Sequence, residues 1–166
     1  MVPVVLVVGP SGVGKTTLLE KLLPVLKRRG LRVAFVKHHR GEFSLDQPGK
    51  DTWRMARAGA AAVAISSPRK FALIRRVQDE LTLEEILGTL GEHDLVLVEG
   101  YKGAAYPKLQ VFRRGFPPEL LAPPGHLIAA VSDFPLDITV PLFSFTAIEG
   151  LAELLVNYGR QQLAKK

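Results

Sequence analysis

Residues 2–16 of the chain read VPVVLVVGPSGVGKT, and this stretch decides the fold. The continuous apolar and β-branched run at 2–8 is typical of a strand buried on both faces of a parallel sheet. Residues 9–16 follow at once and fit the pattern G-x-x-x-x-G-K-[S/T]. Leucines then recur at helical spacing. We therefore predict a strand, a phosphate-binding loop and an amphipathic helix in immediate succession.

Each residue type of the loop has a physical role. Glycines let the backbone wrap tightly, so that successive N–H groups point at phosphate oxygens, and the following helix presents its positive end to the anion. Lys15 supplies a mobile charge for the β- and γ-phosphates, and the Thr16 hydroxyl suits Mg²⁺. Thr17 is either an α-phosphate contact or an ordinary first-turn residue. The predicted nucleotide-binding residues of the loop are Gly9, Ser11, Gly12, Val13, Gly14, Lys15, Thr16 and Thr17.

Strand and helix patterns alternate along the rest of the chain. The helix at 15–29 is expected to stop at Gly30, and Pro24 predicts a kink or an early end. Further strands are expected at 31–36, 62–66, 71–77, 95–98, 109–113 and 127–131, and the two at 62–66 and 71–77 are candidates for pairing around a turn at 67–70. Helices are expected at 51–58, 82–90 and from 146 onward, the last two each opening on a capping box, at 82–85 and 146–149. This order predicts an α/β fold, a P-loop NTPase-like, doubly wound, mostly parallel sheet with helices on both faces. The length fits one nucleotide-binding domain over 1–166.

An acid stands at each end of the strand at 95–98. Asp94 and Glu99 are separated by roughly 16 Å along an extended chain, so they cannot share one metal ion. Ligands of open α/β sheets bind beyond the carboxyl ends of the strands. We therefore predict that Glu99 is a catalytic acid and metal ligand, which with Thr16 positions Mg²⁺ or water. The alternative is a capping or loop salt bridge. Asp94 is expected to be structural.

Charged residues also follow the strand at 31–36. Lys37 and Lys50 are candidates for contact with phosphate or with a second anionic ligand. Asp51 is a candidate catalytic residue that orients water or lies behind the metal, and equally a cap for the helix at 51–58. His38 and His39 are potential metal ligands, but adjacent residues on a strand point to opposite faces. A metal-transport role is therefore disfavoured.

Recognition of a base has a weak signal in this sequence. A guanine-specific loop commonly reads [NT]-K-x-D, and the chain has none. Asp133, at the end of the strand at 127–131, is the nearest candidate, because its carboxylate could accept hydrogen bonds from the guanine N1–H and 2-amino groups. Ordinary turn chemistry before Pro135 is the alternative.

The positive charge is concentrated in one segment. Lys and Arg number 22 against 16 Asp and Glu, a net charge of +6, and residues 37–76 hold nine basic and three acidic side chains. Such a field attracts nucleotide phosphates, another phosphorylated small molecule or an acidic protein, although a solvated basic face is the simpler reading. Nucleic acid is not expected, because no zinc finger, Arg/Gly-rich tail or RNP-like string is present. The absence of Cys excludes disulfides and thiol chemistry.

The apolar segments are short. The run at 2–8 is far below the about 20 residues that cross a bilayer, and it has neither the basic flank nor the cleavage site of a signal peptide. We expect a soluble, cytoplasmic protein with no membrane partner.

The linked motifs resemble those of the MobB family, the molybdopterin-guanine dinucleotide biosynthesis adapter proteins. The resemblance covers most of the chain. It rests on GPSGVGKTTL at 9–18, VKHHRGEF at 36–43, LDQPGKDTWRMARAGA at 45–60, DLVLVEGYK at 94–102 with Lys108 downstream, and AVSD at 130–133. It implies a dimeric, GTP-binding protein with at most weak GTPase activity, which assists the guanylyltransferase that joins GMP to molybdopterin. Relatives often carry further His where Arg40 and Gly41 stand here.

Two other functions use the same loop. A small-molecule kinase would transfer the γ-phosphate to an acceptor, but no Arg-rich lid follows the late helix. A GTP-dependent nickel-insertion protein fits the fold and Glu99, although Cys residues and an [NT]-K-x-D motif are missing. Against these, the resemblance favours a GTP- and Mg²⁺-binding adapter. Its second ligand is expected to be molybdopterin or another phosphorylated small molecule.

Overall fold

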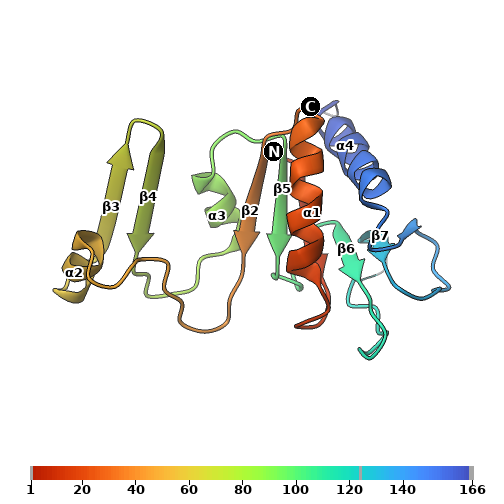
Figure 1. The fold of residues 1–166 in the computed structure, drawn as a ribbon, viewed down its shortest axis with the longest axis horizontal. Helices are drawn as coiled ribbons and strands as arrows, with labels where there is room; N and C mark the ends of the chain where they lie inside the picture. The colour runs from red at the N-terminus through yellow and green to blue at the C-terminus, as the bar shows by residue number, and fades with distance from the viewer. Residues whose placement is uncertain (1, 124, 165–166) are drawn as a thin grey trace. The chain divides into compact units, whose positions relative to one another are not determined.

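The computed structural model describes residues 2–123 and 125–164 of the chain. They form two compact units (Figure 1). The first contains residues up to His38 and from Leu87 onward, and the second is His39–Ile86. The interpretation of the chain as one domain stays a prediction.

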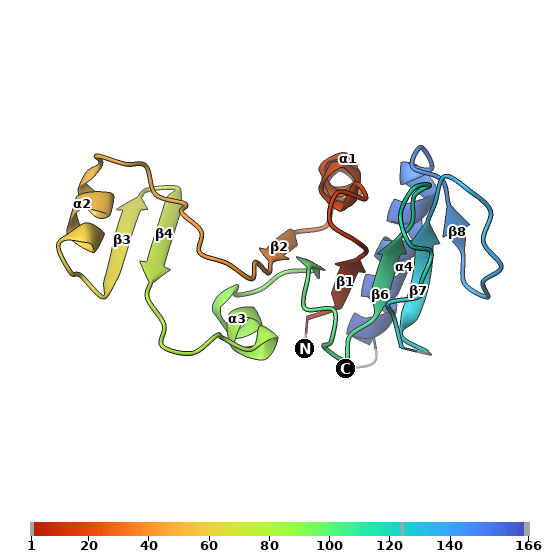
Figure 2. The same ribbon diagram turned by 90° about the horizontal axis from the view of Figure 1, so that it is seen from below.

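A six-stranded sheet forms the centre of the first unit. Its order is β2-β5-β1-β6-β7-β8, and all neighbouring strands run parallel, so the predicted α/β fold is confirmed. The sequence patterns miss β8, a two-residue strand that lies beside β7 (Figure 2). The strands are β1 Val4–Val8, β2 Val33–Lys37, β5 Leu95–Glu99, β6 Lys108–Val111, β7 Leu127–Val131 and β8 Leu142–Phe143.

Strand β1 lies between β5 and β6, and its unbroken apolar sequence fits this central position. Each of its residues is at most 2% exposed, because both faces of the strand are covered. Helices α1 (Lys15–Arg28) and α4 (Ile148–Ala164) pack together over one of these faces. Leu22 and Leu26 of α1 and Leu155 of α4 belong to the core that they share with β1 and β5–β7.

Two buried polar residues of β6 point to the other face of the sheet. Lys108 and Gln110 are 0% and 1% exposed, and they alternate with core residues of the helix-covered face. Lys108 Nζ donates to the carbonyls of Ala104 and Tyr106 at 2.7 and 3.0 Å. The Gln110 amide donates to the Glu119 carbonyl and accepts from the Leu121 N–H. Loops tied to β6 by these bonds therefore cover this part of the sheet. Burial lowers the pKa of Lys108.

Helix α1 ends as its glycine predicts, but it does not end early. The Gly30 N–H donates to the Lys27 carbonyl and the Leu31 N–H to the Leu26 carbonyl, the Schellman pattern. The prediction of an early end at Pro24 is wrong, since α1 continues to Arg28. The carbonyl that a residue-24 N–H would have satisfied belongs to Glu20, which is exposed and can bond water instead.

The start of α4 is joined to the end of α1. The helix begins at Ile148, close to the predicted position. The Glu149 carboxylate accepts from Arg28 Nη2 and Arg29 Nη2, both at 2.8 Å. These hydrogen bonds, first that of Arg29, lower the pKa of Glu149. The acid of the predicted capping pattern thus bonds the arginines of the neighbouring helix.

The second unit is a small helix and a hairpin. Helix α2 is Asp51–Arg57, and strands β3 (Ala62–Ser67) and β4 (Lys70–Arg75) pair antiparallel across the predicted turn at 67–70. Helix α3 (Leu83–Thr89) spans the boundary between the units and has the predicted capping box. The Thr82 N–H donates to Glu85 Oε2 at 2.8 Å, and the Glu85 N–H donates to Thr82 Oγ1 at 3.2 Å.

A close backbone approach at the end of β1 yields a first prediction. Gly9 has φ +148°, and a Cβ there would lie 2.7 Å from the Val111 carbonyl oxygen of β6. Gly30 has φ +87° with no atom within 4 Å of an added Cβ. Gly9→Ala is therefore expected to lower the free energy of unfolding by about 3 kcal/mol, and Gly30→Ala by about 1 kcal/mol. Urea unfolding without ligand measures both, and equal losses would contradict the close approach.

Candidate functional site

The carboxyl ends of β2, β5 and β1 meet at one edge of the sheet. In the strand register, Lys37 pairs with Glu99, and Glu99 pairs with Val7, two residues before Gly9. In Figure 1 the arrows of β2, β5 and β6 point downward, and the loop before α1 lies at the same edge. The predicted loop and the predicted acid are therefore neighbours, as expected for a parallel sheet.

The loop at 9–16 presents backbone rather than side chains. Gly14, the N-cap of α1, has φ +104° and provides no side-chain cap, and no acid stands in the first turn of the helix. The first N–H groups of a helix have no partner within it, and its N-terminus carries partial positive charge. Val13 is fully buried, whereas Ser11 and Thr17 are exposed. The helix start thus has the backbone donors and the polarity to hold an anion.

Lys15 folds back over the loop. Its Nζ donates to the carbonyls of Gly9 and Pro10 at 3.0 and 2.8 Å. Burial lowers the pKa of Lys15, the charge of Lys37 lowers it further, and the Glu99 carboxylate acts in the opposite direction. A bound anion would favour the charged ammonium.

Glu99 is the centre of a sheet-edge cluster made of Lys15, Thr16, Lys37 and Glu99. Its side chain is only 12% exposed, and its Oε1 lies 3.5 Å from Lys37 Nζ. Its Oε2 accepts a hydrogen bond from Thr16 Oγ1 at 3.1 Å. A hydroxyl beside a carboxylate is the oxygen donor set that Mg²⁺ prefers, with waters and phosphate oxygens completing its shell. The residues present therefore fit the predicted metal.

An aromatic pair that the sequence patterns do not reveal lies directly after Glu99. The rings of His38 and Tyr101 stack with 4.4 Å between their centroids. Gly100 permits this approach, because its φ is +107° and a Cβ would lie 2.6 Å from the His38 Cβ. Tyr101 has φ +44°, in the left-handed region that non-glycine residues rarely adopt. The one feature of the sequence that could have drawn attention to this close approach is Gly100, which directly follows the acid at the end of β5.

Asp133 lies at the same sheet edge, after β7. Its Oδ1 accepts a hydrogen bond from the Arg114 backbone N–H at 2.9 Å and so joins the turns after β6 and β7. The turn role considered from the sequence is present. Contact with a base stays a prediction.

Lys50 and Asp51 lie in the second unit. Lys50 is the N-cap residue of α2 and Asp51 its first residue, so Asp51 is not the cap. The Asp51 side chain is 97% exposed, and its Oδ1 lies 3.8 Å from Arg54 Nη1. The catalytic role of Asp51 and the anion contact of Lys50 stay predictions.

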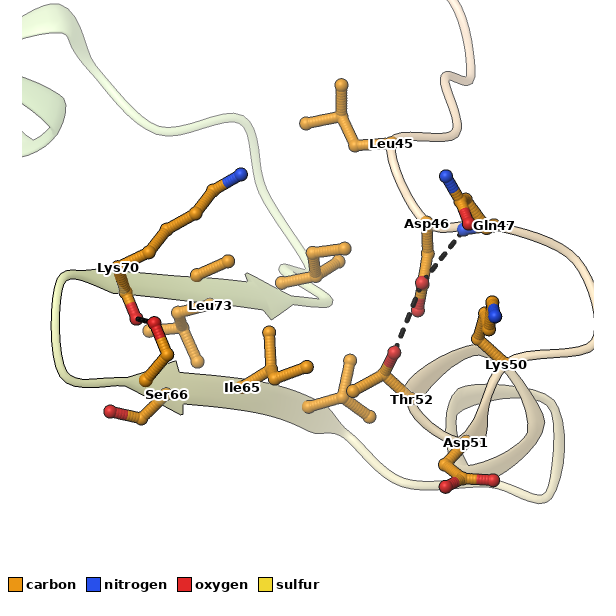
Figure 3. Close-up of a pocket in the computed structure, with 14 residues that line it drawn as sticks. Leu45, Asp46, Gln47, Lys50, Asp51, Thr52, Ile65, Ser66, Lys70 and Leu73 are labelled. Carbon is orange, nitrogen blue, oxygen red and sulfur yellow. Dashed lines mark hydrogen bonds between the residues drawn. The ribbon is translucent and has the colours of Figure 1, made fainter.

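A pocket of about 700 Å³ lies within the second unit. Figure 3 shows Leu45, Asp46 and Lys50 across from Ile65 and Leu73 of the hairpin. Asp46 Oδ1 accepts from the Gln47 N–H and from Thr52 Oγ1, and its Oδ2 is buried without a partner in the described residues. The pocket thus combines an apolar strand face with charged groups.

Two features are absent from residues 2–123 and 125–164. Within these residues, no three His, Cys, Asp or Glu side chains gather as a metal-binding group. No helix in the same residues has the length and apolar character needed to span a bilayer.

Comparison with known proteins identifies the family. Residues 4–133 match the family described as MobB, molybdopterin guanine dinucleotide synthesis protein B. The chain is 38% identical to a molybdopterin-guanine dinucleotide biosynthesis adapter protein of Escherichia coli, with 98% of this chain and 96% of that protein covered. It is 33% identical to a protein of the same description from Haemophilus influenzae, with 95% and 89% covered.

Solved structures agree with this assignment. A crystal structure of molybdopterin-guanine biosynthesis protein B superposes with a TM-score of 0.71 at 31% identity and covers 95% of this chain and 99% of that one. The Bacillus subtilis MobB structure has a TM-score of 0.73 at 28% identity, with 94% and 97% covered. The matched segment contains the loop at 9–16, Glu99 and Asp133. Sequence, fold and site therefore place this chain in the MobB family.

Proposed function

We propose that this chain is an adapter protein of molybdopterin-guanine dinucleotide biosynthesis that binds GTP and Mg²⁺ at the sheet-edge cluster. Membership of the MobB family supports the adapter role. The observation that carries nucleotide binding is the start of α1, where backbone donors, Lys15 and the Thr16–Glu99 pair converge. It combines the three features that a nucleotide phosphate chain with its metal requires.

In this proposal different residues of the protein bind different phosphates of the nucleotide. The N–H groups of the loop and the positive end of α1 hold the β-phosphate, and Lys15 turns from the loop carbonyls to the β- and γ-phosphates. Thr16 and Glu99 would hold Mg²⁺, which neutralises phosphate charge when bound. Lys37, 3.5 Å from Glu99, stands on the side of the terminal phosphate.

Hydrolysis in this proposal is weak. Glu99 is the only acid within the sheet-edge cluster, and it is already engaged by Thr16 and Lys37. Both oxygens of this carboxylate therefore already face partners other than an attacking water. This arrangement suits a protein that binds GTP without turning it over quickly.

Guanine recognition is assigned to Asp133. Its Oδ1 is used by the Arg114 N–H, and a carboxylate has a second oxygen that can accept from a guanine N–H. The hydrogen bond to Arg114 would also hold the carboxylate in one orientation. This assignment supports GTP over ATP, because adenine lacks the N1–H donor.

The partners in this proposal are the guanylyltransferase that joins GMP to molybdopterin, and molybdopterin or another phosphorylated small molecule. The relatives' description as adapter proteins supports the first. Lys50 and Lys70, which line the pocket of the second unit, support the second. Two ammonium groups at an apolar pocket suit a ring that carries a phosphate.

The nucleotide site yields a prediction at Lys15. Lys15→Ala is expected to weaken GTP binding by roughly ten- to a hundredfold, because the charge that meets two phosphates is removed. Lys21→Ala, which removes an exposed lysine of the same helix, is the matched control and should leave the affinity unchanged. Isothermal titration with GTP and Mg²⁺ measures both. Undiminished affinity in the Lys15 variant would contradict the site.

The adapter role has its own test. Titration of the chain with the guanylyltransferase is expected to show binding that strengthens when GTP is present, since the nucleotide would order the sheet edge. Lys15→Ala should bind the partner equally well with and without GTP. If the wild-type chain does not bind the enzyme under either condition, the adapter role is rejected, whatever the GTP affinity.

We also propose that the chain forms a homodimer through the second unit. Phe71 and Leu73 of the hairpin share one of its faces and are 66% and 54% exposed. A two-stranded hairpin is at best marginally stable by itself, and contiguous exposed apolar side chains mark interaction surfaces. A second copy that covers this hairpin satisfies both constraints.

The dimer proposal predicts that one carboxylate introduced on the hairpin surface will prevent dimerisation. Phe71→Asp is expected to shift the chain from dimer to monomer in sedimentation equilibrium, because a carboxylate would be buried without a partner at the interface. Leu120→Asp, at an apolar residue of the first unit that is 58% exposed, is the control and should remain dimeric. A monomeric wild-type chain at micromolar concentration would exclude this assembly.

A further inference from the structure

Arg113 lies against the phosphate-binding loop from the side opposite Lys37. It lies two residues after β6, and a Cβ on Gly14 would lie 3.5 Å from each of its Cζ, Nη1 and Nη2 atoms. These equal distances mean that the flat surface of the guanidinium faces the N-cap of α1. Its Cζ lies 4.5 Å from the centroid of the Phe145 ring. Neither contact uses the guanidinium N–H groups as hydrogen-bond donors.

The backbone around Arg113 is held on both sides. The Phe112 N–H donates to the Val131 carbonyl at 2.8 Å, and the Arg114 N–H donates to Asp133 Oδ1 at 2.9 Å. The Phe116 N–H closes a turn on the Arg113 carbonyl at 3.1 Å. With the Phe145 ring beneath the guanidinium, the position of this cation is set before any ligand arrives.

The charge of Arg113 has no acidic partner in the part of the chain that the structure describes, since no ion pair with a carboxylate within 4 Å includes it. It stands instead beside Gly14 at the N-terminus of α1, which itself carries partial positive charge. Like charges gathered this way are unfavourable by themselves. An anion between them removes the repulsion.

The strand order shows which part of a nucleotide Arg113 can reach. Lys37 and Glu99 end β2 and β5 on one side of β1, whereas Arg113 and Asp133 follow β6 and β7 on the other. Thr16 and Glu99 assign the first side to the metal and the terminal phosphate. The second side therefore faces the phosphates nearer to the nucleoside.

We propose that Arg113 binds the phosphates that GTP and GDP share, on the nucleoside side of the loop. This inference rests on the proposed GTP site. The guanidinium fork matches two phosphate oxygens, and no carboxylate within residues 2–123 and 125–164 forms an ion pair with it. Arg113 thereby completes a set of three cations, with Lys15 over the loop and Lys37 at the terminal phosphate.

Isothermal titrations with GTP and with GDP test the assignment. Arg113→Gln is expected to weaken both ligands by the same factor, about tenfold. Arg113→Lys, which keeps the charge but loses the fork, should lose less. Arg114→Gln is the matched control, because only the backbone of Arg114 is used by Asp133, and it should bind both ligands as the wild type does.

These titrations distinguish failure of the Arg113 proposal from failure of the proposed GTP site. Unchanged affinity of Arg113→Gln for both nucleotides, or a loss confined to GTP, overturns the proposal while the GTP site stands. Failure of the wild-type chain to bind GTP overturns the proposed function itself. Urea unfolding of Arg113→Gln without ligand shows whether the variant is folded, and the Arg113→Lys titrations decide the question if it is not.

Discussion

The turn that joins β1 to α1 is the constraint on which the rest of the first unit depends. β1 is buried between two parallel strands, so the chain must leave it at an edge crowded by β6. Only a residue without a Cβ fits at Gly9, 2.7 Å from the Val111 carbonyl oxygen. The turn then starts α1 with its backbone donors at the sheet edge. The turn at Gly9 thus allows β1 to be buried and at the same time leaves the first N–H groups of α1 open at the sheet edge.

Electrostatics gives this edge its chemical character. Lys15, Lys37 and Arg113 lie around a helix start that has no acid in its first turn. The lowered pKa of Lys15 shows that burial and the neighbouring cation already oppose its charge. The negative charge of Glu99 offsets part of this repulsion. Glu99 and Thr16 also offer oxygen ligands, and they do so only on the β5 side of β1. In the proposed nucleotide site, this asymmetry would orient the phosphate chain, with the metal toward β5 and the nucleoside toward β7.

The second unit follows different physics. Its hairpin exposes most of its apolar residues, and α2 buries none. Such a unit gains little stability from a core of its own. The basic residues of 37–76 belong largely to this unit.

Local sequence patterns predict most of the helices and strands and several residues of the candidate site, although they miss β8. The run at 2–8, the glycine pattern and the capping box at Thr82 each predict structure from neighbours in the chain, because strand burial, tight turns and caps are short-range effects. Glu99 was found by the rule that ligands bind at strand ends. The same rule, applied to the strand at 109–113, would have drawn attention to Arg113.

Tertiary structure alone decided which distant residues meet. Nothing in the sequence places Arg113 against Gly14 or on Phe145, and nothing pairs His38 with Tyr101, because each contact joins two segments that are far apart in the chain. The prediction that α1 ends early at Pro24 failed for a similar reason. The proline leaves the Glu20 carbonyl without its helical donor, and only the packed structure shows that Glu20 is exposed to water. The sequence by itself determined the phosphate-binding loop and the parallel sheet, whose causes are local. The order of strands, set by packing across the whole unit, decided what surrounds that loop.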